Sequence, residues 1–308
     1  MKQYAIGIDL GGTMIKYAIV SSDGEIIYQS STLTPLDKGV NGIVDAFIVA
    51  AKAAIDEASQ RGVEISGIGI GTPGIVSKDG RTVVGGAENL PEWHNLPLAD
   101  SLEASLGLPV AIMNDANAMA LGESIFGAAR NVSDAVFVTV GTGIGGAVMI
   151  DGSLWRGYNG RGMELGHISV DAGERTCACG GKGCLEMYAS TSALVKRFKE
   201  LTGNDADGRI IVSLYNSGDE KAIQAMTEHW RYLGRGIASF INIFSPQMVV
   251  VGGGIAEAGS FYLENLSKEV FSRALPVSAA ETRLVAARLG NTAGCLGAAS
   301  LAFRNKEI

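Results

Sequence analysis

The sequence predicts an α/β protein of two domains, and three observations lead to this prediction. The chain has 308 residues, more than the roughly 100–200 residues typical of one domain. Short apolar segments alternate with segments of helical spacing, which indicates strands covered by helices. Three of the apolar segments run directly into glycine-rich turns, which is typical of sheets that bind ligands at their strand ends.

The first 125 residues predict an α/β layer that begins with three antiparallel strands. Asp23-Gly24 separates the second and third strands and is typical of a tight hairpin. The predicted strands are residues 4–9, 14–20, 25–29, 65–70 and 110–113, and the predicted helices are residues 40–60 and the segment from Asp115 to about residue 126.

A similar order of features recurs after residue 134. A predicted strand over residues 135–140 leads into the glycine-rich turn 141–146, and a second strand over residues 147–150 ends at Asp151-Gly152. This echo predicts two halves of similar topology, with a chance recurrence as the alternative. The remaining predicted elements are helices over residues 191–201, 220–244 and 292–303, a strand over residues 248–251 with a helix after it, and a loop-rich segment over residues 157–183.

The composition argues against several classes of protein. The 32 acidic and 25 basic residues give a net charge of −7, which disfavours a nucleic-acid-binding surface. Asp9 interrupts the first apolar run too early for the core of a signal peptide. The uncharged stretch 237–256 contains Pro246 and three consecutive glycines, which indicates a helix, a break and a buried strand rather than a membrane span. We therefore expect a cytoplasmic protein that binds neither nucleic acid nor membranes.

Three glycine-rich turns form the first candidate site. They are Asp9-Leu10-Gly11-Gly12-Thr13, the segment with Gly141, Thr142, Gly143, Ile144, Gly145 and Gly146, and Gly252-Gly253-Gly254. Turns without Cβ atoms let backbone N–H groups point at phosphates, and Asp9 at a strand end could hold Mg²⁺ through water. Each could instead be only a tight turn, because none contains the Gly-Lys-Ser/Thr of a P-loop. Their shared place after strands favours a polyphosphate site.

Asn114-Asp115 marks the point where a predicted strand meets a predicted helix. One interpretation is that Asp115 caps the helix N-terminus. The other is that Asp115 is a general base, since a carboxylate can accept the proton of a sugar hydroxyl as it attacks phosphorus. The residues alone leave both interpretations open.

The cysteines predict a metal site. Cys177, Cys179 and Cys184 lie within eight residues, and His167 precedes them by ten. Three thiolates and one imidazole can surround a tetrahedral Zn²⁺, and a closed set of four ligands is typical of a structural rather than a catalytic zinc. A redox pair or a chance cluster are the alternatives. The zinc would fix the loop that Glu164 and Glu186 flank.

A loop over residues 89–94 carries Asn89 and Trp93. These side chains could hydrogen-bond and stack on a sugar, or the segment could be a surface loop.

In combination, these motifs resemble the ROK family (repressor, open reading frame, kinase), in its sugar-kinase branch. The resemblance extends from Ile6-Gly7-Ile8-Asp9 to the last helix. The motifs that carry it are the Asp9 turn, Gly71-Thr72-Pro73-Gly74, Asn114-Asp115, the turn 141–146, Glu164-x-Gly166-His167, and the three cysteines with Glu186.

The resemblance implies an actin-like, hexokinase-like (ribonuclease H-like) fold of two α/β domains around a central cleft. The expected domains are residues 1–118 with 292–308, and residues 119–291 with the zinc loop. It implies transfer of the γ-phosphoryl group of ATP, with Mg²⁺, to the primary hydroxyl of a hexose, glucose being the first expectation. Family members are often homodimers or homotetramers.

The resemblance also assigns roles to residues. Asp115 corresponds to the catalytic base, and His167 would ligate zinc through one ring nitrogen and face the sugar with the other. The implied sugar-binding residues are Gly74, Asn89, Asn114, Asp115, Glu164, His167 and Glu186; the implied ATP- or phosphate-binding residues are Asp9, Gly11, Gly12, Thr13, Lys16, Gly141, Thr142, Gly143, Gly145, Gly253 and Gly254; and the implied zinc ligands are His167, Cys177, Cys179 and Cys184.

One departure from the family pattern concerns the choice of sugar. The family usually has Ala-Gly-Glu where this chain has Gly162-Met163-Glu164. The Met163 side chain could point into the sugar pocket and alter its shape, or into the core as a gap filler. N-acetylmannosamine and N-acetylglucosamine are therefore alternative substrates.

Two further alternatives lack catalysis: a sugar-responsive repressor and a sugar-binding protein. The family's repressors carry an N-terminal helix-turn-helix of about 60–80 residues, whereas this chain reaches its first phosphate motif by Asp9. We therefore expect the kinase.

Overall fold

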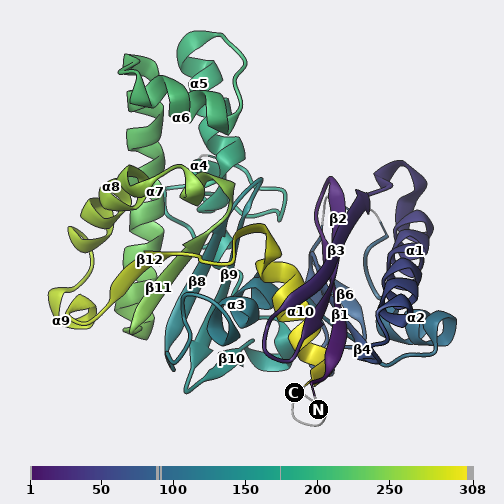
Figure 1. The fold of residues 1–308 in the computed structure, drawn as a ribbon. Helices are drawn as coiled ribbons and strands as arrows, with labels where there is room; N and C mark the ends of the chain where they lie inside the picture. Colours follow the sequence, from purple (N-terminus) through teal and green to yellow (C-terminus); the bar gives the residue numbers. More distant parts are fainter. Residues whose placement is uncertain (1, 88–89, 91, 174, 304–308) are drawn as a thin grey trace. The chain divides into compact units, whose positions relative to one another are not determined.

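The computed structural model describes residues 2–87, 90, 92–173 and 175–303, and these residues form two compact units (Figure 1). The first unit contains residues 1–131, 156–162 and 291–308. The second contains residues 132–155 and 163–290. Each unit is built on its own five-stranded sheet and has its own hydrophobic core.

The sheet of the first unit has the strand order β3-β2-β1-β4-β7. Strand β1 pairs antiparallel with β2, which pairs antiparallel with β3, whereas β1, β4 and β7 run parallel. These strands are β1 Tyr4–Leu10, β2 Met14–Ser21, β3 Ile26–Leu33, β4 Ile65–Thr72 and β7 Val110–Asn114, and a separate hairpin pairs β5 Ile75–Val76 with β6 Val83–Gly85.

Isoleucines and glycines alternate along β1 and β4, and this alternation decides which helix covers each face of the sheet. Ile6, Ile8, Ile68 and Ile70 belong to the core that also contains apolar side chains of α1 (Gly39–Gln60) and α2 (Leu98–Leu106). On the other face, a Cβ atom at the register-paired Gly7 or Gly69 would overlap the backbone of α10 (Ala293–Phe303). The glycines therefore let α10 lie directly against the sheet, opposite α1 (Figure 1). Helix α3 (Asp115–Ile125) packs along α10.

The sheet of the second unit has the strand order β10-β9-β8-β11-β12. Its pairing repeats that of the first unit, with two antiparallel pairs followed by two parallel pairs. These strands are β8 Ala135–Val140, β9 Ile144–Ile150, β10 Ser153–Trp155, β11 Met248–Gly252 and β12 Arg283–Ala286. The expectation of two halves with similar topology is confirmed.

Helices pack on this second sheet around α7 (Glu220–Phe244), whose apolar stripe supplies much of the core. Asp219 caps its N-terminus by accepting a hydrogen bond from the Ala222 N–H. The other helices are α4 Glu186–Ala189, α5 Thr191–Thr202, α6 Gly208–Asn216, α8 Ser260–Phe271 and α9 Pro276–Ala279, with short 3₁₀ turns η1 Leu36–Lys38, η2 Tyr158–Gly160, η3 Leu165–His167, η4 Gly254–Glu257 and η5 Gly290–Thr292.

The start of one strand differs from the expected one for a physical reason. Strand β9 begins at Ile144 rather than at residue 147, because Ile144 already pairs with Val140 and only residues 141–143 remain as the turn. Helix α3 lies whole within the first unit, whose first segment ends at residue 131. The uncharged stretch 237–256 divides into the end of α7, a break and β11, as expected.

Within the described part of the chain, no helix has the length and apolar character needed to cross a membrane.

Candidate active site

Asp9 lies near the carboxyl end of β1 beside a lysine. In the sheet register it pairs with Lys16 of β2 and with Gly71 of β4. Burial raises the pKa of the Asp9 carboxyl, and the charge of Lys16 acts against this shift. The Lys16 Nζ donates to Asn291 Oδ1 at 3.1 Å. A carboxylate and an ammonium group therefore lie at one sheet edge, and these groups suit Mg²⁺ and phosphate respectively.

The turn after Asp9 is narrow and open. The Gly11 N–H donates to the Met14 carbonyl at 3.0 Å, and Thr34 Oγ1 donates to the Gly11 carbonyl at 2.7 Å. Gly12 and Thr13 are exposed, and a Cβ atom at Gly12 would meet nothing within 4 Å. The hydrogen bonds of Gly11 fix the turn, and the exposed backbone at Gly12 and Thr13 can approach a ligand closely.

Asn114 and Asp115 have different roles at the start of α3. Asn114 is the N-cap, because its Oδ1 accepts from the Asn117 N–H at 3.1 Å. Asp115 is the first helical residue, and its Oδ1 accepts from the Ala116 N–H at 2.8 Å. The alternative in which Asp115 is the cap is therefore wrong. The helix N-terminus stabilises the negative charge of Asp115.

The parallel register of β1, β4 and β7 brings Asp9 and Asp115 to the same edge. A Cβ atom built on Gly71 would lie 3.5 Å from Asp9 Oδ1 and 3.8 Å from the Asp115 Cα. One glycine thus separates a carboxylate suited to a hydrated cation from a carboxylate suited to a proton.

Other predicted sugar residues of the first unit differ in outcome. The Gly74 carbonyl accepts from Asn114 Nδ2 at 3.0 Å, and Gly74 has φ +90°, which favours glycine. Asn89 lies outside the described residues. Trp93 is 1% exposed, and its Nε1 donates to Thr72 Oγ1 at 3.0 Å. The expectation that Trp93 stacks on a sugar or lies in a surface loop is wrong, because its ring packs near Phe47 in the core.

In the second unit, His167, Cys177, Cys179 and Cys184 converge as predicted. One potential ligand atom from each residue lies within 4.8 Å of the others. The Cys179 and Cys184 sulfurs are 3.7 Å apart, and Cys177 Sγ is 3.7 Å from His167 Nδ1. A tetrahedral zinc with Zn–S bonds of about 2.3 Å places its sulfurs about 3.8 Å apart, so these side chains fit the group.

Backbone hydrogen bonds hold residues 177–184, the cysteine loop, in this shape. The Cys177 N–H donates to the Gly181 carbonyl at 2.9 Å, and the Gly180 N–H donates back to the Cys177 carbonyl at 3.0 Å. The Gly181 N–H points at Cys179 Sγ, at 3.4 Å, and lowers the pKa of that thiol. Burial, followed by the nearby Glu186 carboxylate, raises the pKa of Cys177.

Glu186 connects the cysteine loop to a glycine turn. It is the first residue of α4, and its Oε1 lies 3.0 Å from Cys177 Sγ and 3.8 Å from His167 Nδ1. A Cβ atom on Gly143 would lie 2.8 Å from its Oε2. Since His167 directs Nδ1 toward the cysteine, Nε2 is the ring nitrogen left for a substrate.

Glu164 and Met163 precede the η3 turn that carries His167. Glu164 is exposed, and its carbonyl accepts from the His167 N–H at 3.0 Å. Met163 has φ +70° and packs against the core of the second unit. The core-facing alternative for Met163 is therefore the one that the structure supports. A non-glycine residue in this conformation is strained, which explains why a glycine suits this position.

The two glycine turns of the second unit lie at one edge of its sheet. In the parallel pair of β8 and β11, Gly252 is opposite Thr139, so the turns after both strands are neighbours. Gly253 has φ +97°, and a Cβ atom there would overlap the Val140 carbonyl. Gly141, Thr142 and Gly254 face open space or solvent. The Thr191 N–H donates to the Gly141 carbonyl at 2.8 Å and fixes the first turn.

The predicted residues thus gather at two places, each within one unit. Those of the first unit are Asp9, Gly11, Gly12, Thr13, Lys16, Gly74, Asn114 and Asp115; those of the second unit are Gly141, Thr142, Gly143, Gly145, Glu164, His167, Cys177, Cys179, Cys184, Glu186, Gly253 and Gly254. Sequence reasoning missed Asn291, which binds Lys16, and Gly294, where a Cβ atom would lie 2.6 Å from the Asp9 carboxyl carbon.

Comparison with known proteins identifies the family. The ROK family profile matches residues 5–305. The chain is 36% identical to the glucokinase of Thermotoga maritima over 310 aligned positions, which cover 96% of each protein. It is also 36% identical to a putative xylose repressor of Caldicellulosiruptor sp., covering 96% of this chain and 77% of the repressor.

A solved structure supports the same assignment. The crystal structure of a ROK family glucokinase from Streptomyces griseus, in complex with glucose and AMPPNP, matches with a TM-score of 0.88 at 34% identity, covering 98% of this chain and 100% of the other. The chain belongs to the ROK family and has its two-domain, actin-like ATPase fold. Both expectations drawn from the sequence are confirmed.

Proposed function

We propose that this protein is an ATP-dependent hexose kinase that phosphorylates the primary hydroxyl of glucose. The observation that carries the proposal is the meeting of Asp9, Gly71 and Asp115 at the ends of neighbouring strands. The 36% identity to a glucokinase over 96% of both chains supports it.

Asp115 is the proposed base. Its carboxylate is placed by the first turn of α3 and by the hydrogen bond from the Ala116 N–H. It would accept the proton of the sugar hydroxyl as the oxygen attacks the γ-phosphorus, and general bases of this kind contribute about 10²–10⁴-fold in rate.

Phosphate binding is assigned to the glycine turns and Lys16. Backbone N–H groups of the exposed turns after β1, β8 and β11 would donate to phosphate oxygens, and Lys16 would neutralise charge. Asp9 is the residue proposed to hold Mg²⁺, which would supply positive charge to offset that of the phosphates.

Sugar binding is assigned to Glu164, His167 and Glu186, with Gly74, Asn89, Asn114 and Asp115 as further predicted contacts. The spacing of His167, Cys177, Cys179 and Cys184 supports a structural zinc. A zinc held by four protein side chains has no open position, so it would fix the loop and the His167 ring rather than react.

The first experiment is an ADP-release assay over glucose, mannose, N-acetylmannosamine, N-acetylglucosamine and xylose. We expect glucose to have the highest kcat/KM. A clear preference for an N-acetylhexosamine would replace glucose as the substrate, and absence of ADP release with every sugar would overturn the proposed kinase.

The Asp115→Asn variant is the control for the chemical step. We expect it to bind glucose and ATP with Kd values within about twofold of the wild type and to lose about 10³-fold or more in kcat. A variant that keeps most of its turnover would remove Asp115 as the base.

The second candidate function is sugar-responsive regulation, favoured by the 36% identity to the putative xylose repressor. A regulator without catalysis would bind sugar and release no ADP, so the same assay combined with a sugar-binding titration separates the two functions.

A further inference from the structure

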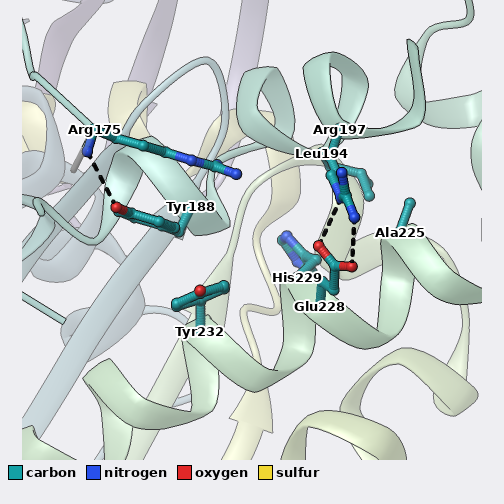
Figure 2. Close-up of a pocket in the computed structure, with 8 residues that line it drawn as sticks. All are labelled: Arg175, Tyr188, Leu194, Arg197, Ala225, Glu228, His229 and Tyr232. Atoms are coloured by element: carbon teal, nitrogen blue, oxygen red, sulfur yellow. Dashed lines mark hydrogen bonds and ion pairs between the residues drawn. The ribbon is translucent and has the colours of Figure 1, made fainter. Parts of the chain in front are cut away.

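Arg175 contacts both the cysteine loop and the helix that begins with Glu186. Its guanidinium carbon is 4.4 Å from the centroid of the Tyr188 ring, and its Nη1 donates to the Met187 carbonyl at 2.8 Å. Its backbone N–H also points at the Tyr188 hydroxyl, at 3.3 Å. Figure 2 shows the long Arg175 side chain extending over Tyr188. Arg175 therefore contacts Met187 and Tyr188, the two residues that follow Glu186.

Arg175 also closes the base of the cysteine loop. Its carbonyl accepts from the Gly183 N–H at 3.0 Å, directly before Cys184. The next residue, Thr176, forms a bridge with Lys182. The loop and the start of α4 are thus joined through one residue.

The aromatic partner of Arg175 is itself fixed. Tyr188 is 5% exposed, and its ring centroid lies 4.6 Å from that of Tyr232 on α7. The Arg235 guanidinium lies 5.3 Å from the Tyr232 ring and donates to the Val170 carbonyl at 3.5 Å. Stacking of this kind contributes beyond the burial of area alone. The long α7 therefore supports Arg175 through Tyr232 and Tyr188.

The position of Glu186 depends on contacts on both of its sides. Cys184, two residues earlier, belongs to the metal cluster, whereas Met187 and Tyr188 follow directly in α4. Helix α4 has four residues, far too few to keep its direction without tertiary contacts. Arg175 supplies two of those contacts, at Met187 and Tyr188, beside the packing of Tyr188 on α7.

We propose that Arg175 is a positioning residue for sugar binding, which holds α4 so that the Glu186 carboxylate faces the substrate. The inference rests on the proposed function through the sugar-binding role of Glu186. Arg175 itself acts on the α4 backbone and the Tyr188 ring, without touching the substrate. An arginine suits this role, because its planar guanidinium can stack on an aromatic ring and donate to a carbonyl at the same time.

The test compares Arg175→Met, which keeps the length of the side chain but loses the charge, with Arg175→Lys. Loss of a charge-assisted hydrogen bond that orients a ligand group predicts that Arg175→Met raises the glucose KM about tenfold. The ATP KM and kcat stay within about twofold, because the glycine turns and Asp115 are untouched. The glucose Kd measured without ATP rises by the same factor, and Arg175→Lys recovers part of the loss.

The matched control is Arg197→Met. Arg175 and Arg197 both line one small pocket of the second unit, but the Arg197 guanidinium pairs with Glu228, with Nε 2.7 Å from Oε2 (Figure 2). We expect it to lower the melting temperature and leave the glucose KM unchanged. Zinc content measured by mass spectrometry should equal that of the wild type in all three variants.

The outcomes separate this inference from the proposed function. A wild type that binds glucose without phosphorylating it overturns the kinase, and the glucose Kd of Arg175→Met still decides the role of Arg175. An Arg175→Met enzyme with an unchanged glucose KM and Kd overturns the inference, as does equal weakening of glucose and ATP. A wild type that binds no sugar overturns both.

Discussion

At the residue scale, three glycines leave space that a neighbouring functional group occupies. Gly143 borders the Glu186 carboxylate, Gly294 borders the Asp9 carboxylate, and Gly253 borders the Val140 carbonyl. The chain has 42 glycines, an unusually high number, and contacts of this kind explain some of them. At Gly143 and Gly294 the missing Cβ atom decides where a predicted ligand group lies.

Gly143→Ala tests this at Glu186. The new Cβ atom would lie 2.8 Å from Glu186 Oε2, a distance that side chains essentially never show, so the flexible carboxylate must move. We expect a folded protein whose glucose Kd, measured by calorimetry without ATP, rises about tenfold through loss of a charge-assisted hydrogen bond.

Gly141→Ala is the matched control in the same turn, since its Cβ atom would meet nothing within 4 Å. Its glucose Kd should equal that of the wild type. Equal weakening by both alanines would mean that the turn, and not the Glu186 contact, decides sugar affinity.

At the element scale, the sequence predicted those strands whose side chains are buried. Strands β1, β4, β7, β8 and β11 are apolar runs that end at glycine or at polar residues, and each was expected within three residues of its observed bounds. Edge strand β12 was missed, because its terminal residues Arg283 and Ala286 are exposed and leave no apolar pattern. The short helices α2 and α6 were missed as well.

The candidate site was predictable where its residues are close in sequence. The spacing of the cysteines was enough to predict that Cys177, Cys179 and Cys184 form a cluster. The contact between Lys16 and Asn291 spans 275 positions, and the α4 contacts of Arg175 depend on how the cysteine loop closes. Neither follows a local periodicity, so only the fold reveals them.

Removing the proposed zinc should weaken sugar binding through the loop. We expect about one zinc per chain in the protein as purified, and its loss on dialysis against a strong chelator or in Cys179→Ser. Because Glu186 and His167 lose their fixed positions, the glucose Kd should rise about tenfold or more. Adding Zn²⁺ back to the chelated wild-type protein should restore the original Kd.

The first unit provides the control, because its sheet shares no residue with the cysteine loop. Its core, which contains Trp93, should remain folded after chelation. Metal analysis that finds no zinc in active wild-type protein would end the assignment.

At the scale of the whole molecule, two sheets of the same order and strand direction carry different sets of candidate site residues. In each unit a glycine turn joins an antiparallel pair, and parallel strands follow on the other side. The first unit holds Asp9, Lys16 and Asp115, whereas the second holds the cysteine loop and Glu186. The shared pattern was predictable from the repeated strand–turn–strand order, whereas no sequence pattern indicated that segment 156–162 groups with the first unit.

A buried histidine predicts that acid lowers the unfolding free energy of the second unit. His229 on α7 is 1% exposed, its Nε2 lies 2.8 Å from the Tyr262 hydroxyl, and its Nδ1 has no hydrogen-bond partner among the described residues. Burial lowers its pKa from 6.5 to about 4. The unfolded chain therefore binds a proton at a pH where the folded chain does not, so stability is full above pH 6.5 and is lost as pH falls toward 4.

We expect His229 to cost about 2 kcal/mol of unfolding free energy at pH 5 and about 3 kcal/mol near pH 4, relative to pH 7. Urea unfolding at pH 7, 6, 5 and 4.5, followed by tryptophan fluorescence and circular dichroism, measures this dependence. His229→Gln keeps a polar group within reach of Tyr262 but cannot titrate, so its curve should be flatter by that amount. Acid release of zinc would affect both proteins alike, and therefore only their difference reports on His229. Identical pH dependence in the two proteins would mean that the buried imidazole does not limit the acid stability of this unit.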